Sequence, residues 1–174
     1  HCLIVDRQAS QESTSEIKDF QNEIILYNNH ECLQNQGVAA LFPKYATTSM
    51  DSLRWSLKPV FVAQLLKSNA IDAVAFVDSD QFFIGSPAPL FTDHATSRFI
   101  LSPHDRTVFP DDGQEFHDHL TDGIFNGGLF VARRDAIEIL DWWAMACAYR
   151  CEKNKPRGLF VDQRYLDLIP TQFS

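Results

Sequence analysis

Residues 73–80 read AVAFVDSD, an apolar run that leads directly into two aspartates one residue apart. An apolar run without polar alternation is typical of a strand buried on both faces of a parallel sheet. Ligands of open α/β sheets bind beyond the carboxyl ends of such strands, where Asp78 and Asp80 stand. Two neighbouring carboxylates repel each other, and Mg²⁺ or Mn²⁺ relieves that repulsion. The stretch therefore predicts a metal-assisted site that holds a diphosphate; the alternative is a plain polar turn after a strand.

The rest of the chain predicts one α/β domain over residues 1–174, because strands alternate with helices. Strands are expected at residues 3–6, 23–27, 73–77, 98–102 and 124–132. Helices are expected at residues 32–42, 50–67, 134–150 and 160–169, with Pro59 starting or kinking the second of them. Residues 103–122 are polar and are expected to form a loop. A domain seldom opens on a bare buried strand, so we expect the sequence to lack an earlier strand and helix.

The composition indicates an acidic globular protein. Hydrophobic residues make up 45% and charged residues 22%, which are ordinary values that exclude a disordered chain. The net charge of −8 argues against nucleic acid or an anionic membrane as a bulk partner. No apolar run approaches the roughly 18 residues that a membrane span requires. An acidic protein that handles a diphosphate therefore needs local cations or a metal ion.

The cysteines give a weaker indication of the compartment. Their spacing lacks the density of a disulfide scaffold, which favours buried, reduced thiols and a cytoplasmic protein. The four are Cys2, Cys32, Cys147 and Cys151.

Two later motifs complete a set with the aspartate pair: residues 123–130 read GIFNGGLF, and residues 158–163 read GLFVDQ. In this order the three motifs resemble the nucleotide-diphospho-sugar glycosyltransferases of the GT-A fold, in a bacterial branch, from about Met50 onward. The resemblance implies a mixed, mainly parallel sheet flanked by helices. It also implies a metal-dependent glycosyltransferase of the hexosyltransferase type. Its donor would be a nucleoside-diphosphate sugar, and its acceptor a hydroxyl of a glycan, lipid or small molecule.

The resemblance implies roles for individual residues. Asp80 would ligate the Mn²⁺ or Mg²⁺ that bridges the donor's phosphates, and Asp78 would contact the metal or the ribose. Asp162 would act at the reacting sugar, either as the base for the acceptor hydroxyl or as a sugar-binding carboxylate. The remaining donor-binding positions are Lys58, Asn126, Gly127, Gly128 and Gln163.

These donor-binding positions have distinct chemistry. Lys58 would offset phosphate charge, the two glycines beside Asn126 would let the backbone approach the sugar, and Gln163 would hydrogen-bond its hydroxyls. Members of the family also close the nucleotide and metal sites with an early strand and helix and with C-terminal residues. We expect those parts to be missing from this sequence.

Each assignment also has a structural alternative. The Asn-Gly-Gly segment of residues 126–128 forms a bulge in a strand, Asp162 caps the last helix, and Lys58 is solvated at a helix start. Trp142 and Trp143 are expected to pack in the core rather than to bind sugar. Three histidines are expected to be exposed rather than metal ligands: His104, His117 and His119.

Two other functions stay open. One is a catalytically inactive nucleotide- or sugar-binding relic of the same fold. The other is a phosphatase of the haloacid dehalogenase class, which also places Asp-x-Asp after a buried strand and which Ser102 imitates in its second motif. Against the phosphatase, Gln81 and Phe82 replace the Gly-Thr expected after the aspartates.

Overall fold

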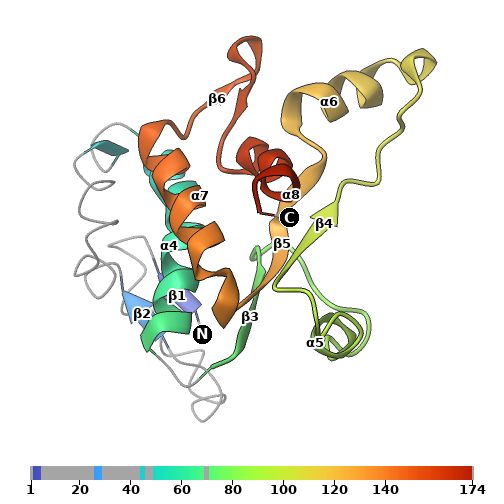
Figure 1. The fold of residues 1–174 in the computed structure, drawn as a ribbon. Helices are drawn as coiled ribbons and strands as arrows, with labels where there is room; N and C mark the ends of the chain where they lie inside the picture. Colours follow the sequence, from blue (N-terminus) through green and yellow to red (C-terminus); the bar gives the residue numbers. More distant parts are fainter. Residues whose placement is uncertain (1, 5–25, 29–43, 46–48, 69–70, 174) are drawn as a thin grey trace.

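The computed structural model describes residues 2–4, 26–28, 44–45, 49–68 and 71–173. Its central sheet has three strands, β3 (Ala73–Val77), β4 (Phe99–Pro103) and β5 (Phe125–Arg133), with β5 in the middle (Figure 1). Both neighbours pair with β5 in the antiparallel sense. The described part of the chain contains one parallel pair, between the short strands β1 (Cys2–Ile4) and β2 (Leu26–Asn28). The prediction of a GT-A-like, mainly parallel sheet is therefore wrong for the described residues.

The error has a physical origin in the apolar run itself. All five residues of β3 are half-buried rather than enclosed on both faces. An unbroken apolar sequence indicates that both faces of the strand are at least partly shielded from water. Whether the strand pairs in the parallel or antiparallel sense depends on how the chain connects the strands. Here the chain returns through β5 in the opposite sense, so the strand was predicted correctly and its pairing was not.

One face of the sheet forms the core with two long helices. Register places Phe76, Phe130 and Leu101 in one row across the three strands. The next row holds Val74, Ala132 and Phe99, each two residues from the first row on its strand, as the alternation of strand side chains requires. Both rows belong to the hydrophobic cluster or pack against it.

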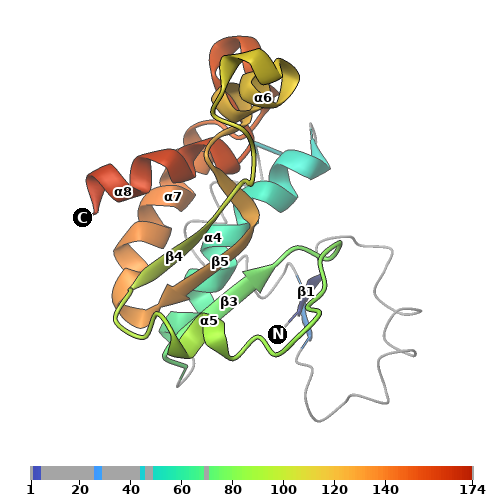
Figure 2. The same ribbon diagram turned by 90° about the vertical axis from the view of Figure 1, so that its right-hand side faces the viewer.

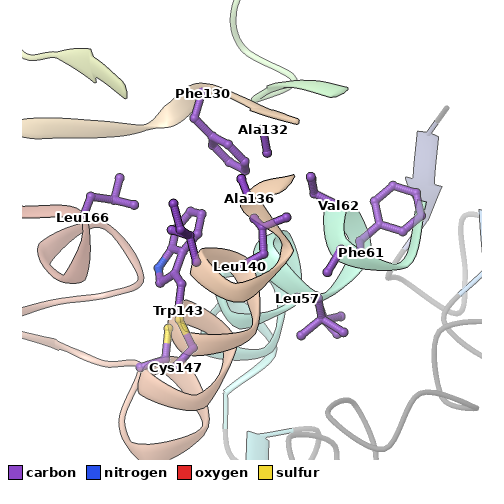
Figure 3. Close-up of a cluster of buried hydrophobic side chains, with 14 of the residues drawn as sticks. Leu57, Phe61, Val62, Phe130, Ala132, Ala136, Leu140, Trp143, Cys147 and Leu166 are labelled. Carbon is purple, nitrogen blue, oxygen red and sulfur yellow. The ribbon is translucent and has the colours of Figure 1, made fainter. Parts of the chain in front are cut away.

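The two helices are α4 (Met50–Ser68) and α7 (Ile137–Tyr149), which lie side by side behind the strands in Figure 2. Trp143 of α7 is fully buried and meets the Phe130 ring edge-on, with 5.1 Å between the ring centroids (Figure 3). Trp142 is half-buried against Phe173, so both tryptophans pack as predicted. Pro59 lies inside α4, and the expectation of a helix that starts near it is wrong.

The segment after β4 is not the loop that its polarity suggested. Residues 114–122 form α6 (Gln114–Asp122), which begins after Gly113 at φ +55° and ends before Gly123 at φ +108°. These glycines bound the helix because positive φ is easily reached only without a side chain. Figure 1 shows α6 projecting beyond the end of the sheet.

The remaining elements are short. They are α5 (Pro89–Thr92), η2 (Pro110–Asp112), η3 (Arg134–Ala136), β6 (Lys153–Asn154), η4 (Lys155–Arg157), β7 (Leu159–Phe160), η5 (Gln163–Leu168) and α8 (Ile169–Gln172). The helix expected over residues 134–150 is thus η3 followed by α7, and that over 160–169 begins three residues late as η5. The helix expected over residues 32–42 lies outside the described residues.

Two further predictions can be compared with the structure. Cys147 and Cys151 are free and buried, which confirms the prediction of buried, reduced thiols for this pair. Within the described ranges, none of the helices has the length and apolarity to cross a membrane.

The core depends on Trp143 in a way that mutation can test. Trp143→Ala removes a fully buried ring and leaves a cavity, so the free energy of unfolding should fall by about 3–5 kcal/mol. Urea unfolding followed by circular dichroism measures the change. Trp142→Ala, at the half-buried neighbouring position, should cost clearly less, and equal losses in the two variants would contradict this account of the core.

Candidate functional site

Lys58 brings the separate motifs together. Its ammonium nitrogen lies 3.1 Å from Asp78 Oδ1 and 3.2 Å from Asp78 Oδ2. The same nitrogen donates to the backbone oxygen of Gly127 at 3.2 Å and lies 3.6 Å from Asp162 Oδ2. The Lys58 side chain is only 11% exposed, so the prediction of a solvated lysine at a helix start is wrong. Lys58 instead stands in mid-helix and connects α4, the end of β3, β5 and the start of η5.

The two aspartates of the opening motif occupy a turn at the end of β3. The backbone N–H of Asp78 donates to the Gly128 oxygen at 2.8 Å, which continues the pairing with β5. The N–H of Gln81 donates to the Asp78 oxygen at 3.1 Å and closes the turn. Asp80 is exposed on this turn, whereas Asp78 is partly covered by Lys58. The alternative prediction, a polar turn after a strand, is therefore correct for the backbone. The turn also places its carboxylates at the group formed by Lys58, Asp78, Asp162 and Gly127, which is called the Lys58 cluster below.

A cleft of about 750 Å³ borders this turn. Its walls come from α4, including Trp55 and Phe61, and from the whole of β3, and the aspartate turn lies at its end. A cleft with an apolar body and a few charged groups at one end is the usual form of a small-molecule site.

The Asn-Gly-Gly segment forms a bulge and also lines the site. The register of β4 against β5 jumps from Leu101–Phe130 to Ser102–Asn126, which confirms the predicted bulge. Within it, the Asn126 side-chain oxygen accepts from the Gly128 N–H at 2.8 Å. The bulge is confirmed, and the donor-binding role of the segment stays a prediction.

Both glycines of the bulge face charged side chains at close range. A Cβ at Gly128 would lie 2.7 Å from Gln81 Nε2 and 2.9 Å from Asp78 Oδ2. A Cβ at Gly127 would lie 3.2 Å from Asp162 Oδ2. Only a residue without a side chain lets the bulge approach the carboxylates this closely.

Asp162 is a buried carboxylate at the start of η5. Its side chain is 1% exposed, and Oδ2 has no hydrogen-bond partner among the described residues. Burial raises its pKa to about 6, although Lys58 acts in the opposite direction. Asp162 stands at the N-terminus of η5 without making a capping hydrogen bond, so the prediction of a cap is wrong.

Two neighbours fix where Asp162 points. Val161 has φ +49°, a strained value for a β-branched residue, and strain of this kind is concentrated at functional sites. The indole N–H of Trp143 donates to the Asp162 backbone oxygen at 2.9 Å. Core packing and local strain together hold the carboxylate beside Gly127.

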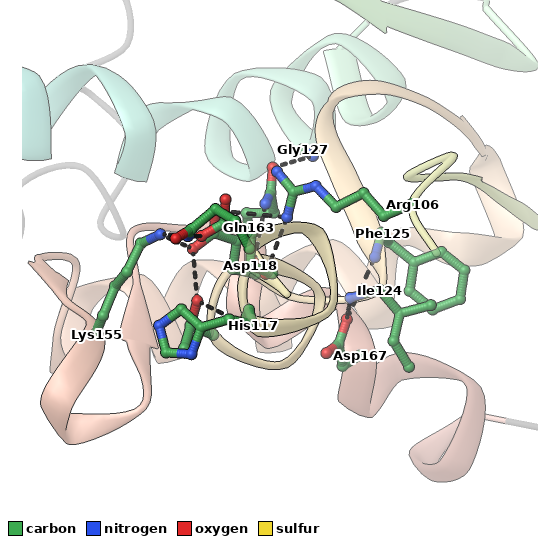
Figure 4. A network of polar contacts seen from close by, with 12 residues as sticks. Arg106, His117, Asp118, Ile124, Phe125, Gly127, Lys155, Gln163 and Asp167 are labelled. Atoms are coloured by element: carbon green, nitrogen blue, oxygen red, sulfur yellow. Dashed lines mark hydrogen bonds and ion pairs between the residues drawn. The ribbon is translucent and has the colours of Figure 1, made fainter. Parts of the chain in front are cut away.

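Gln163 connects this cluster to a second polar network, shown in Figure 4. Its side-chain oxygen accepts from the Gly127 N–H at 3.0 Å, and its side-chain nitrogen donates to the Asp122 backbone oxygen at 2.9 Å. Lys155 lies 2.7 Å from Asp122 and 3.0 Å from Asp118, which ties α6 to the segment after α7. Gln163 is thus engaged with the protein backbone at both ends of its amide, rather than free to hydrogen-bond a sugar hydroxyl.

The three histidines lie around α6, and they differ in exposure. His117 is exposed as predicted, whereas His104 and His119 are half-buried, so for those two the prediction is wrong. His104 Nε2 and His119 Nδ1 are buried without a hydrogen-bond partner among the described residues. Burial is also the main cause of a lowered pKa at His104.

A divalent cation at the aspartate turn would need a ligand to complete its coordination. No group of three or more histidine, cysteine or acidic side chains within the described residues could hold a metal ion alone. Mg²⁺, however, binds to proteins through one or two carboxylates together with substrate phosphates. Asp78 and Asp80 supply that oxygen donor set on one open turn.

The sequence motifs therefore identified most of the cluster, and missed three contributors. Gln81 packs over Gly128, Asp122 anchors Gln163, and Val161 orients Asp162. Gln81 immediately follows the aspartate pair and could have been included on position alone. Nothing in the sequence signals the roles of Asp122 and Val161, because both depend on tertiary contacts or on a dihedral angle.

The buried carboxylate predicts a pH-dependent stability. The folded pKa of Asp162 is about 6 and its ordinary value is 3.8. The stabilising effect of its protonated form is thus complete below pH 3.8 and is lost as the pH rises through 6. Asp162→Asn removes this loss, so the variant should gain on the order of 3 kcal/mol over wild type between pH 3.5 and 7.5. Urea unfolding of both proteins across this range measures the difference; parallel curves would contradict a raised pKa.

The glycine bulge predicts a local steric requirement. Gly128→Ala forces the Gln81 amide and the Asp78 carboxylate apart and should cost about 1–3 kcal/mol of stability. Gly85→Ala is the matched control, because a Cβ there meets nothing within 4 Å, and it should change stability by less than about 0.5 kcal/mol. Thermal unfolding of the two variants tests this, and equal midpoints would contradict the close approach.

Comparisons with known proteins give relatives without an assigned activity. The chain is 32% identical over 124 residues to the uncharacterized protein YfnF of Bacillus subtilis (strain 168), an alignment that covers 68% of this chain and 41% of YfnF. It is 30% identical over 124 residues to the uncharacterized protein YfnD of the same strain, covering 68% of this chain and 38% of YfnD. No protein-family model and no solved structure matches the chain. The chain thus spans about two fifths of the length of the curated relatives it matches.

Proposed function

We propose that the Lys58 cluster is the donor site of a metal-dependent glycosyltransferase that uses a nucleoside-diphosphate sugar. The observation that carries the proposal is the meeting of Asp78, Asp162 and the Gly127 backbone at one ammonium. Three motifs from distant parts of the sequence thereby bring the aspartate turn, a close backbone approach and a buried carboxylate to one lysine.

The aspartate turn is the phosphate end of the site. Asp80, with Asp78, would hold Mn²⁺ or Mg²⁺, which when bound neutralises charge on the departing diphosphate. Lys58 adds the second positive charge on the inner side of the turn. The apolar walls of the cleft beside the turn suit the nucleoside.

The bulge and Asp162 form the sugar end. Gly127 and Gly128 let the β5 backbone come close to Asp162, Asp78 and Gln81, and we assign the donor sugar to this end of the site. Asp162 is assigned as the base that takes the proton of the acceptor hydroxyl. Its raised pKa, about 6, lies close to neutral pH, where a carboxylate is ionised and still a useful proton acceptor.

Binding of the donor nucleotide tests the proposal. The thermal midpoint is measured with Mn²⁺ and each of a panel of nucleoside diphosphates. A ligand at about 100 times its dissociation constant stabilises a protein by roughly 2.7 kcal/mol, a midpoint rise on the order of 5–10 °C for a chain of this size. We expect such a rise with one nucleotide, only when Mn²⁺ is present, and its loss in Asp80→Asn.

The control variant is Asp111→Asn, which removes an equally exposed aspartate from η2, away from the Lys58 cluster. It should keep the full midpoint rise. Hydrolysis of the matching sugar nucleotide then separates a transferase from a binding relic, which would bind the nucleotide without releasing sugar. No rise with any nucleotide would contradict the proposed donor site.

A further inference from the structure

Lys58 has two acidic partners, and it satisfies them unequally. Its ammonium nitrogen contacts both oxygens of Asp78, at 3.1 and 3.2 Å. It lies 3.6 Å from Asp162 Oδ2, beyond the range of a good hydrogen bond, and that oxygen has no other hydrogen-bond partner among the described residues. The exposed carboxylate therefore holds the lysine, and the buried one is left incompletely paired.

The unequal pairing of Lys58 with Asp78 and Asp162 is unexpected from the exposure of the two carboxylates. The Asp78 side chain is 37% exposed and can be solvated by water, whereas that of Asp162 is 1% exposed. A buried carboxylate without full pairing is the more costly of the two. A small increase in the pairing of Lys58 with Asp162 would therefore be favourable whenever Asp78 finds another positive partner.

The surroundings of Lys58 permit such a shift over a short distance. Bringing the nitrogen from 3.6 Å to hydrogen-bond range of Asp162 requires a movement of about 0.4 Å. The Gly127 oxygen at 3.2 Å and the Phe76 ring, whose centroid is 5.3 Å from the nitrogen, lie beside both positions. These contacts can stay largely in place while the lysine changes its main acidic partner.

A divalent cation on Asp78 supplies the driving force. Bound there, it would add positive charge next to the Lys58 ammonium, and like charges close together in a partly buried setting repel each other. We propose that Lys58 is a displaceable counter-ion, which occupies Asp78 when no divalent cation is bound and moves onto Asp162 when one binds. The inference rests on the proposed cation site at Asp78 and Asp80, and makes Lys58 a positioning residue that couples this site to Asp162.

Coupling between the cation site and Asp162 through Lys58 should change the affinity for Mn²⁺ in variants of these residues. If Lys58 competes for Asp78, Lys58→Met should bind Mn²⁺ about tenfold more tightly than wild type. Asp162→Asn removes the second partner of Lys58 and should weaken Mn²⁺ binding, although Asp162 is not a ligand. In the Lys58→Met background the same Asp162→Asn change should have little further effect, because no lysine remains to be displaced.

The experiment measures Mn²⁺ alone, from the electron paramagnetic resonance signal of the free ion, with wild type, the two single variants and the double variant. The double variant guards against misfolding, since it removes the ammonium together with the buried charge it compensates. A second readout is the ¹⁵Nζ resonance of Lys58, identified by its loss in Lys58→Arg. It should shift on addition of diamagnetic Mg²⁺ in wild type and not in Asp80→Asn.

The outcomes separate this inference from the proposed function. Tighter binding in Lys58→Met and in the double variant, with a Mg²⁺-dependent Lys58 shift, supports the displaceable counter-ion. Mn²⁺ binding by wild type that is unchanged or weaker in both lysine variants overturns it and leaves the donor site standing. Absence of Mn²⁺ binding in all four proteins overturns the displaceable counter-ion, and the Mn²⁺-dependent midpoint rise with a nucleoside diphosphate then decides the donor site separately.

Discussion

One lysine ammonium holds the candidate site together. Lys58 faces the end of β3 through Asp78, the β5 bulge through the Gly127 oxygen and the start of η5 through Asp162. Each of these groups carries negative charge or a lone pair, and each is at least partly withdrawn from water. Without the ammonium, the carboxylate of Asp162 would be a buried charge with no compensating partner, which proteins avoid by protonation or rearrangement. The same ammonium therefore holds the site residues in place and compensates their buried negative charge.

Trp143 links the hydrophobic core to the start of η5, where Asp162 lies. Trp143 packs edge-on against Phe130 of the central strand, and its indole N–H donates to the Asp162 backbone oxygen. Four residues before Phe130 the same strand contains the start of the bulge, at Asn126, where its register against β4 changes. The packing that stabilises the sheet thus also sets the separation between the bulge and Asp162. Loss of core packing should disturb the site before any charged group is changed.

Sequence patterns predicted the individual strands and helices better than the direction of strand pairing and the tertiary contacts between side chains. The apolar run of β3 and the amphipathic α7 were predictable, because a run of apolar residues and their helical spacing can both be recognised in a short segment of sequence. The antiparallel direction of the sheet was not, since it depends on connections rather than on residue type. Lys58 was assigned to solvent because helical lysines usually are, and only the tertiary structure brings two carboxylates to it. Helix α6 was missed because its sequence is polar, and because it is held by ion pairs such as Lys155–Asp122 rather than by a buried apolar face.

The charge balance of the cluster determines the order in which ligands can bind. Two carboxylates face one ammonium at its centre, and the exposed Asp80 adds a third negative charge on the adjoining turn. A chain of net charge −8 adds a repulsive background for any anion. A diphosphate approaching this turn alone would meet more negative than positive charge, and the attraction of Lys58 is already spent on Asp78. At the proposed site, a divalent cation on Asp78 and Asp80 would reverse the sign at the turn, while Lys58 shifts its main pairing from Asp78 to Asp162. If the proposed donor site is correct, cation binding and diphosphate binding should favour each other, since the turn alone repels the anion.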